Sequence, residues 1–483
     1  MIREYHNLKA REIAAGIKSR KFRAVEICRT ALERAFSAGK NLNAFITVTA
    51  ELAQRQAEAI DARVISGEPV GPLAGVPVAL KDNICLTGYP TTCASHILDG
   101  FTPPYDATCA RRLCNAGAVI IGKTNMDEFA MGSSNENSYY GPCANPIREN
   151  LVPGGSSGGS AAIVAARIAP LAYGSETGGS VRQPASFCGL YGLKPTYGAI
   201  SRYGLVAFAS SMDQIGPMAR NTEDVALAYQ TVCGRDEHDS TSVAFEHPDY
   251  LNLTSVERKF RFGLPMEFLG DGVDREVKQN IETAVEQLRK RGHEIINISL
   301  PHSPLAIAVY YVIADAEASS NLARFDGVRY GLRKEAEELE QMYRRTRSQG
   351  FGAEVKRRIM LGTYVLSAGY YDAYYYKAQQ VRELIRRDFE QAFREVDLLI
   401  TPTAPTVAFS RAEKISDPLT MYLSDIFTAP ANLAGIPALS APCGFTSEKL
   451  PVGLQFIGPP FGEAMLFQAS YALEIILKEN AVL

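Results

Sequence analysis

Several features that mark common protein classes are absent or scarce in this chain. It has no tryptophan, and no apolar run approaches the roughly 18 residues of a membrane span. The nine cysteines are scattered without a C-x-x-C pair, which argues against a zinc site or a disulfide framework and favours reduced thiols in a cytoplasmic protein. Basic and acidic residues nearly balance, 50 against 53, so bulk charge does not make the chain a nucleic-acid binder. The first residues are charged and lack an apolar core, which predicts no secretory signal.

The composition is that of a large globular protein. The 483 residues are 46% hydrophobic and 21% charged. Length alone suggests about three domains. The chain has no linker-like stretch and no internal repeat, so we expect one large domain over residues 1–483. Within it we expect N-terminal helices over 1–65, a core over 66–220 and a helical, substrate-binding insertion over 300–395.

The spacing of apolar residues predicts an α/β fold. Apolar residues recur at helical intervals over 8–36 and 50–63, and helices are also expected at 109–116, 160–169, 274–291 and 466–478. Continuous apolar runs at 75–80 and 118–121 suit strands buried on both faces, and strands are also expected at 261–264, 294–298 and 397–402. Alternation of the two kinds predicts a single mixed, twisted β-sheet with helices on both faces.

Two segments rich in glycine and serine, 153–160 and 174–184, carry the candidate chemistry. The pair Gly178–Gly179 directly precedes Ser180, so a tight turn there can direct several backbone N–H groups towards one point beside a hydroxyl. A nucleophile with N–H donors for a developing oxyanion is what acyl transfer requires. The alternatives are a flexible loop and a phosphate-binding loop. Neither segment has the P-loop ending, the dinucleotide-binding glycine pattern or the G-x-S-x-G elbow.

A serine nucleophile needs a base. None of the six histidines lies in a glycine-rich or strand-end context, so we expect structural or surface roles for them. Lys81 ends the apolar run 75–80, and burial there would lower its pKa and supply a neutral amine. The competing interpretation is a lysine held in an ion pair.

Three stretches together resemble the amidase signature family. They are G-V-P-V-A-L-K-D-N from residue 75, P-G-G-S-S-G-G-S from residue 153 and G-S-E-T-G-G-S-V-R-Q-P-A from residue 174. The resemblance implies that Ser180 is the acyl-forming nucleophile, that Ser156, held by a cis peptide, bridges it to the base, and that Lys81 is that base. It also implies an oxyanion hole made by the backbone of Thr177, Gly178, Gly179 and Ser180. The family mostly has Asp where this chain has Glu176.

Further stretches, 321–331, 355–363 and 369–375, are similar to the glutaminase component of the amidotransferases that act on Glu-tRNA(Gln) or Asp-tRNA(Asn). That branch implies a glutamine donor whose α-carboxylate meets a cation and whose α-amino group meets an acid. The matching positions are Arg358 and Asp425, with Tyr310 as a third candidate. An arginine fork suits a carboxylate, although Arg358 could also be one more cation on a basic helix surface.

The resemblance also implies partners. Ammonia released here would pass to a partner in a heterotrimer with subunits B and C, where ATP and Mg²⁺ activate the misacylated tRNA, and this chain itself would hold no cofactor or metal. The alternatives are a stand-alone amidase for a small amide and an inactive component that only binds a ligand. The sequence does not distinguish service to tRNA(Gln) from service to tRNA(Asn).

Overall fold

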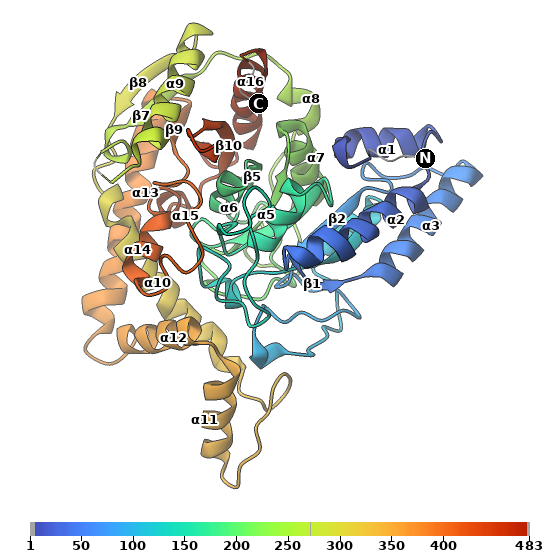
Figure 1. Ribbon diagram of the computed structural model, residues 1–483. Coiled ribbons are helices and arrows are strands. Elements are labelled where there is room, and N and C mark those ends of the chain that lie inside the picture. Colours follow the sequence, from blue (N-terminus) through green and yellow to red (C-terminus); the bar gives the residue numbers. More distant parts are fainter. Residues whose placement is uncertain (1–4, 271, 481–483) are drawn as a thin grey trace.

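The apolar runs of the chain form one eleven-stranded sheet in the computed structural model, which describes residues 5–270 and 272–480 (Figure 1). The strands are β1 (Phe45–Val48), β2 (Pro77–Lys81), β3 (Val119–Thr124), β4 (Leu171–Glu176), β5 (Tyr191–Lys194), β6 (Gln214–Ala219), β7 (Arg261–Pro265), β8 (Glu294–Ile298), β9 (Leu398–Pro402), β10 (Ala438–Phe445) and β11 (Pro451–Ile457). Their order across the sheet is β1-β3-β2-β4-β6-β5-β10-β11-β9-β7-β8.

The sheet is mixed, as the sequence predicts. Strands β3, β2 and β4 run parallel at one side, and β9, β7 and β8 run parallel at the other. The strands between them, β6, β5, β10 and β11, pair antiparallel with their neighbours. Because β2 and β4 are parallel neighbours, Lys81 and Glu176, their last residues, reach the same edge of the sheet.

Helices lie on both faces of the sheet or beside it. They are α1 (Ala10–Lys18), α2 (Ala24–Arg34), α3 (Ala50–Ser66), α4 (Thr108–Asn115), α5 (Gly158–Ala165), α6 (Arg182–Phe187), α7 (Thr222–Val232), α8 (Tyr250–Thr254), α9 (Arg275–Lys290), α10 (Ala306–Asn321), α11 (Leu339–Gly350), α12 (Ala353–Val365), α13 (Lys377–Glu395), α14 (Pro418–Tyr422), α15 (Ala429–Leu433) and α16 (Glu463–Glu479). Consecutive residues of β4 show the two faces. The Tyr173 hydroxyl donates to the Ala228 carbonyl of α7, whereas Gly174 faces Ser157 on the side of α5.

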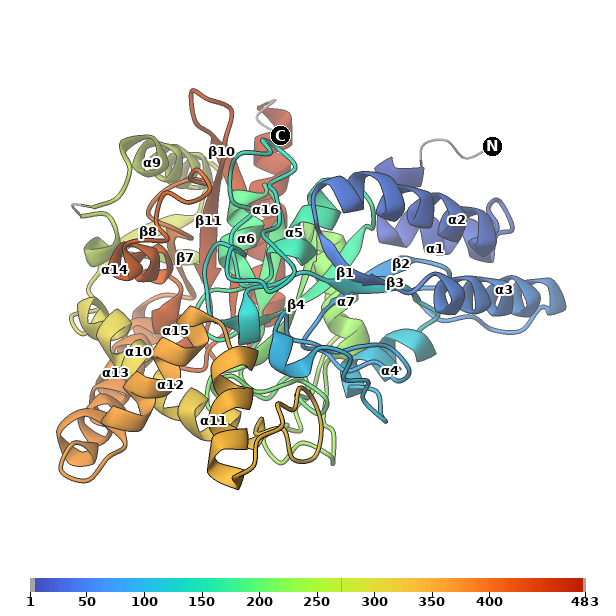
Figure 2. The same cartoon turned by 60° about the horizontal axis from the view of Figure 1, so that its bottom comes forward.

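The helices of residues 306–395 gather on the side of the molecule opposite to α1–α3 (Figures 1 and 2). Figure 2, turned so that the bottom of Figure 1 comes forward, shows α11 and α12 in front of the rest. No helix in the described part of the chain is both long and apolar enough to cross a membrane. All nine cysteines are free thiols.

Most predicted elements are confirmed within one to three residues, and the helix expected over 160–169 is the exception. Helix α5 begins at Gly158 and ends at Ala165, because the chain turns at Arg167, whose φ is 57°. The sequence did not predict the strands β1, β4, β5, β6, β10 and β11. Glycine, serine and proline interrupt the apolar pattern of several of them, as in β4 (LAYGSE) and β6 (QIGPMA).

Candidate active site

Lys81 and Ser156 form a buried pair at the end of β2. The Lys81 Nζ donates to the Ser156 Oγ at 2.7 Å and to the Ser175 carbonyl at 3.0 Å. Both side chains are fully shielded from solvent. Burial lowers the pKa of the Lys81 amine to about 7, against the opposing influence of the Asp127 and Asp213 carboxylates. A large fraction of this amine is therefore neutral at neutral pH and able to take a proton from a hydroxyl.

Ser156 lies in the glycine-rich segment that leads into α5, and its peptide bond with Gly155 is cis. The segment is tied to β4 and to the turn after it. The Ser157 Oγ donates to the Ser175 carbonyl at 3.1 Å, and the Ser157 backbone N–H donates to the Ser180 carbonyl at 3.2 Å. A Cβ on Gly174 would lie 2.6 Å from the Ser157 Oγ, so only glycine lets the strand approach this closely. The two serine-containing segments therefore meet at one point.

The turn between β4 and α6 presents free amide groups. Among the described residues, the N–H groups of Thr177, Gly178, Gly179 and Ser180 donate to no other group. These residues have little or no exposure, with Ser180 at 6%. Unpartnered buried donors are costly, so this turn is suited to receive an oxyanion beside the Ser180 hydroxyl.

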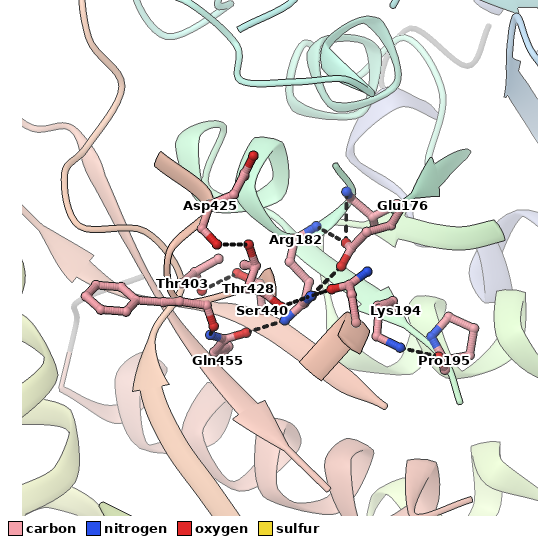
Figure 3. Close-up of polar contacts among 12 residues, drawn as sticks. Glu176, Arg182, Lys194, Pro195, Thr403, Asp425, Thr428, Ser440 and Gln455 are labelled. Atoms are coloured by element: carbon pink, nitrogen blue, oxygen red, sulfur yellow. Dashed lines mark hydrogen bonds and ion pairs between the residues drawn. The ribbon is translucent and has the colours of Figure 1, made fainter. Parts of the chain in front are cut away.

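Glu176 and Arg182, which lie before and after this turn in the chain, contact each other (Figure 3). The Glu176 carboxylate accepts the backbone N–H groups of Val181 and Arg182, each at 3.0 Å, and forms an ion pair with the Arg182 guanidinium. The guanidinium also donates to Gln455 at 2.6 Å and to the Thr428 carbonyl at 2.9 Å. Burial alone would raise the pKa of Glu176, but the Arg182 charge holds it below its ordinary value. Glu176, which stands where the family mostly has Asp, thus binds two backbone N–H groups at the end of the turn.

Two further carboxylates flank the pair, and sequence reasoning missed them. Asp213 accepts the Thr177 hydroxyl at 2.6 Å and the Phe208 backbone N–H at 2.8 Å. Asp127 accepts the Asn135 backbone N–H at 2.8 Å and donates its own N–H to the Ser156 carbonyl at 3.2 Å. Burial raises the pKa of both to about 6. The available signal was an acidic residue beside a buried strand, after β3 for Asp127 and before β6 for Asp213.

Asp425 and Tyr310 lie directly against the turn. A Cβ on Gly178 would meet the Tyr310 hydroxyl at 2.8 Å, and one on Gly179 would meet the Asp425 Oδ1 at 2.7 Å. The Asp425 Oδ2 accepts the Ser133 hydroxyl at 2.5 Å, while Oδ1 has no partner among the described residues. Burial raises the pKa of Asp425 to about 7. An unpartnered carboxylate oxygen beside the turn is a ready acceptor for an ammonium group.

Arg358 projects from α12 into an aromatic cage. It is 2% exposed, its Nε forms an ion pair with the Glu354 carboxylate at 2.8 Å, and its guanidinium lies 5.0–5.7 Å from the ring centres of Phe208, Tyr311 and Tyr422. It is therefore not the surface cation that the basic helix pattern allowed. A cavity of about 110 Å³ lies beside it, lined by residues that include Gly132, Ser134, Glu354, Arg357, Arg358 and Lys414. We call it the Arg358 cavity.

The sequence-predicted residues thus come together from segments far apart in the chain. Ser133, which contacts Asp425, is followed by Ser134, which lines the Arg358 cavity, so the cavity and the turn adjoin. The arrangement brings the segment of Ser180 against the segment of Ser156, whose hydroxyl contacts the Lys81 amine, beside backbone amide groups, an arginine and a carboxylate. It can perform acyl transfer on an amino-acid amide.

Comparison with known proteins gives matches over nearly the whole chain. The Amidase family model matches residues 26–467. The chain is 56% identical over 473 residues to the A component of the glutamyl-tRNA(Gln) amidotransferase of Carboxydothermus hydrogenoformans, covering 98% of this chain and 97% of that protein. The crystal structure of the A component of the glutamyl-tRNA(Gln) amidotransferase from Thermotoga maritima matches with a TM-score of 0.80 and 42% identity, covering 96% and 94% of the two chains. A peptide amidase, solved with the competitive inhibitor chymostatin, matches with a TM-score of 0.83 and 30% identity, covering 98% of each chain.

Proposed function

This chain belongs to the amidase family, and we propose that it works as the glutamine-hydrolysing subunit of a tRNA-dependent amidotransferase. It is an amidotransferase enzyme, and proteins at 54–56% identity over nearly its full length are named as the A component of glutamyl-tRNA(Gln) amidotransferase. The chain is accordingly one subunit of a multi-subunit enzyme. The observation that carries the assignment of its chemistry is the 2.7 Å contact of Lys81 with Ser156 beside four unpartnered amide groups.

The geometry supports a relay mechanism. Neutral Lys81 takes the Ser156 proton as Ser156 takes the Ser180 proton, and the Ser180 Oγ attacks the side-chain amide carbon of glutamine. The amide groups of the turn hold the oxyanion of the tetrahedral intermediate. The relay then returns a proton to the leaving nitrogen, and ammonia departs from an acyl-enzyme. Water adds by the same route, and glutamate and free Ser180 are the products.

Donor recognition fits the two charges of an amino acid. The Arg358 guanidinium would bind the α-carboxylate, and the open oxygen of Asp425 would accept from the α-ammonium group. Tyr310, whose hydroxyl lies against Gly178, would close the side of the site. An amidase for a simple amide needs no such pair of charges, which favours an amino-acid donor.

The partner subunits complete the reaction in this proposal. They are subunits B and C of a cytoplasmic heterotrimer, and they would receive the ammonia, bind ATP and Mg²⁺, and hold most of the misacylated tRNA. The near balance of charge in this chain fits tRNA contacts made mainly by a partner.

One experiment tests the nucleophile and the complex together. The enzyme co-purified with its partners is quenched during glutamine turnover, and the acyl adduct is mapped by mass spectrometry. We expect the adduct on Ser180, with loss of adduct and of glutamine-dependent amidation in Ser180→Ala. Glutamine-dependent amidation at the wild-type rate in Ser180→Ala would overturn the assignment.

A further inference from the structure

The Arg358 cavity contains an excess of positive charge. Three of its lining side chains are cations, Arg357, Arg358 and Lys414, and the lining carboxylate among the described residues is Glu354. Glu354 forms ion pairs with both arginines, Arg357 and Arg358. The two arginines therefore share one carboxylate, and Lys414 forms no ion pair with a described residue, although Glu413 and Asp425 act on its charge at longer range.

Lys414 is buried without an ionic partner. Its exposure is 9%, and its Nζ lies farther than 4.0 Å from every described carboxylate oxygen. Its contacts are the face of the Phe409 ring, 4.1 Å from the Nζ to the ring centre, and the Ser424 Oγ at 3.5 Å. Neither contact neutralises an ammonium charge, and a charge removed from water is costly unless it is paired. The Lys414 ammonium group is therefore able to pair with an anion that enters this cavity.

The position of Lys414 indicates which anion. Ser424, which it contacts, precedes Asp425, and the two functional cations Arg358 and Lys414 line one cavity that adjoins Asp425. A zwitterion that places its ammonium on Asp425 has its carboxylate one carbon away, on the side of these cations. The Arg358 Nε is engaged by Glu354, so its Nη groups remain for the carboxylate, and the Lys414 ammonium would add a second positive charge beside it.

We propose that Lys414 is a specificity residue that binds the α-carboxylate of the amide donor together with Arg358. This inference rests on the proposed function, because it takes the donor to be a free amino acid. When the donor enters, its carboxylate replaces the missing counter-charge of Lys414. A donor that lacks an α-carboxylate leaves the buried Lys414 ammonium without an ion-pair partner, so its kcat/KM is lower than that of glutamine.

The test compares two donors in the assembled enzyme. L-glutaminamide has a neutral carboxamide where L-glutamine has its α-carboxylate, the group that Lys414 would contact. For Lys414→Met we expect kcat/KM for glutamine to fall about 10- to 100-fold, mainly through KM, as for loss of one charge-assisted hydrogen bond. We expect kcat/KM for L-glutaminamide to change much less. The ratio of the two kcat/KM values, which measures the preference for glutamine, therefore falls by about the same factor as the value for glutamine. Lys414→Arg, which keeps the charge, restores most of that preference.

The matched control is Lys449→Met, the same substitution at an exposed turn between β10 and β11. A structural role for Lys414 would lower the values for both donors equally and leave their ratio unchanged. That result, or an unchanged KM for glutamine, overturns the inference while the proposed function stands. Absence of glutamine hydrolysis in the assembled wild-type enzyme instead contradicts the proposed function itself.

Discussion

Lys81 gives the protein its expected pH dependence at the residue scale. The pKa of the Lys81 amine is about 7. At a pH below this value the amine is protonated and cannot take the Ser156 proton, and at a higher pH it is neutral and can act as the base. We expect kcat/KM for glutamine to rise with pH through about 7 and then to level off. Lys81→Ala should lose about 100- to 10,000-fold in rate, as for removal of a general base. Because the pKa of Asp425 is also about 7, the inflection alone does not identify the base, and a Lys81→Ala enzyme with the wild-type rate above pH 7 would contradict this role.

Arg358 provides a second residue-scale prediction. It is buried and caged by three rings, so its loss removes the proposed guanidinium partner of the donor's α-carboxylate, and Lys414 would supply only a single ammonium group in its place. In Arg358→Ala we expect the KM for glutamine to rise about 100-fold, the range for removing a buried charged partner. Amidation supported by added ammonia bypasses the donor site and should continue. Equal losses with glutamine and with ammonia would count against a donor-binding role.

At the scale of elements, the turn between β4 and α6 depends on a buried ion pair. Removal of Arg182 would leave the Glu176 carboxylate uncompensated at a position with no exposure. Arg182→Met should therefore destabilise the fold by about 3–5 kcal/mol, seen as a lower thermal unfolding midpoint. The double variant Glu176→Gln with Arg182→Met should recover part of that loss, because no charge is then left unpaired. A single variant as stable as the wild type would exclude a structural role for the pair.

At the scale of the whole molecule, thiol reactivity reports global unfolding. Eight of the nine free cysteines are buried and one, Cys114, is partly exposed. Burial also raises the pKa of the Cys114 thiol to about 11, so even this group reacts slowly. With Ellman's reagent we expect at most one thiol per native chain to react, and all nine in denaturant. Rapid reaction of several thiols under native conditions would contradict the packing of the sheet and helices.

The sequence predicted the parallel parts of the sheet better than its centre. The runs that became β2, β3 and β9 are short, largely apolar and buried throughout, as strands covered on both faces are. The segment that became β4 carries Gly174 and Ser175 because it must lie against the serine-containing segment. These small and polar residues interrupt the apolar pattern from which the strand could have been predicted.

Some residues of the candidate site were predicted from the sequence, and others were recognised only in the structure. Lys81, Ser156 and Ser180 were predicted from local patterns, an apolar run and two glycine-rich segments, together with the resemblance to the family. Asp127, Asp213 and Lys414 were missed because nothing in their local sequence shows what they contact. Each contacts groups from a distant segment, as Asp213 does with Thr177 and Lys414 with the Arg358 cavity.

The sequence by itself determined the fold class, the pair of glycine-rich segments and the residue types available for acyl transfer. Those properties follow from local periodicity and from backbone freedom, which neighbouring residues set. The tertiary structure alone decided that burial lowers the pKa of the Lys81 amine to about 7 and that four amide groups of the turn have no partner in the described part of the chain. It also decided that Lys414 is buried and forms no ion pair with any residue that the structure describes. Desolvation and charge pairing depend on what surrounds a group in space, and that surrounding comes from segments hundreds of residues apart in the chain.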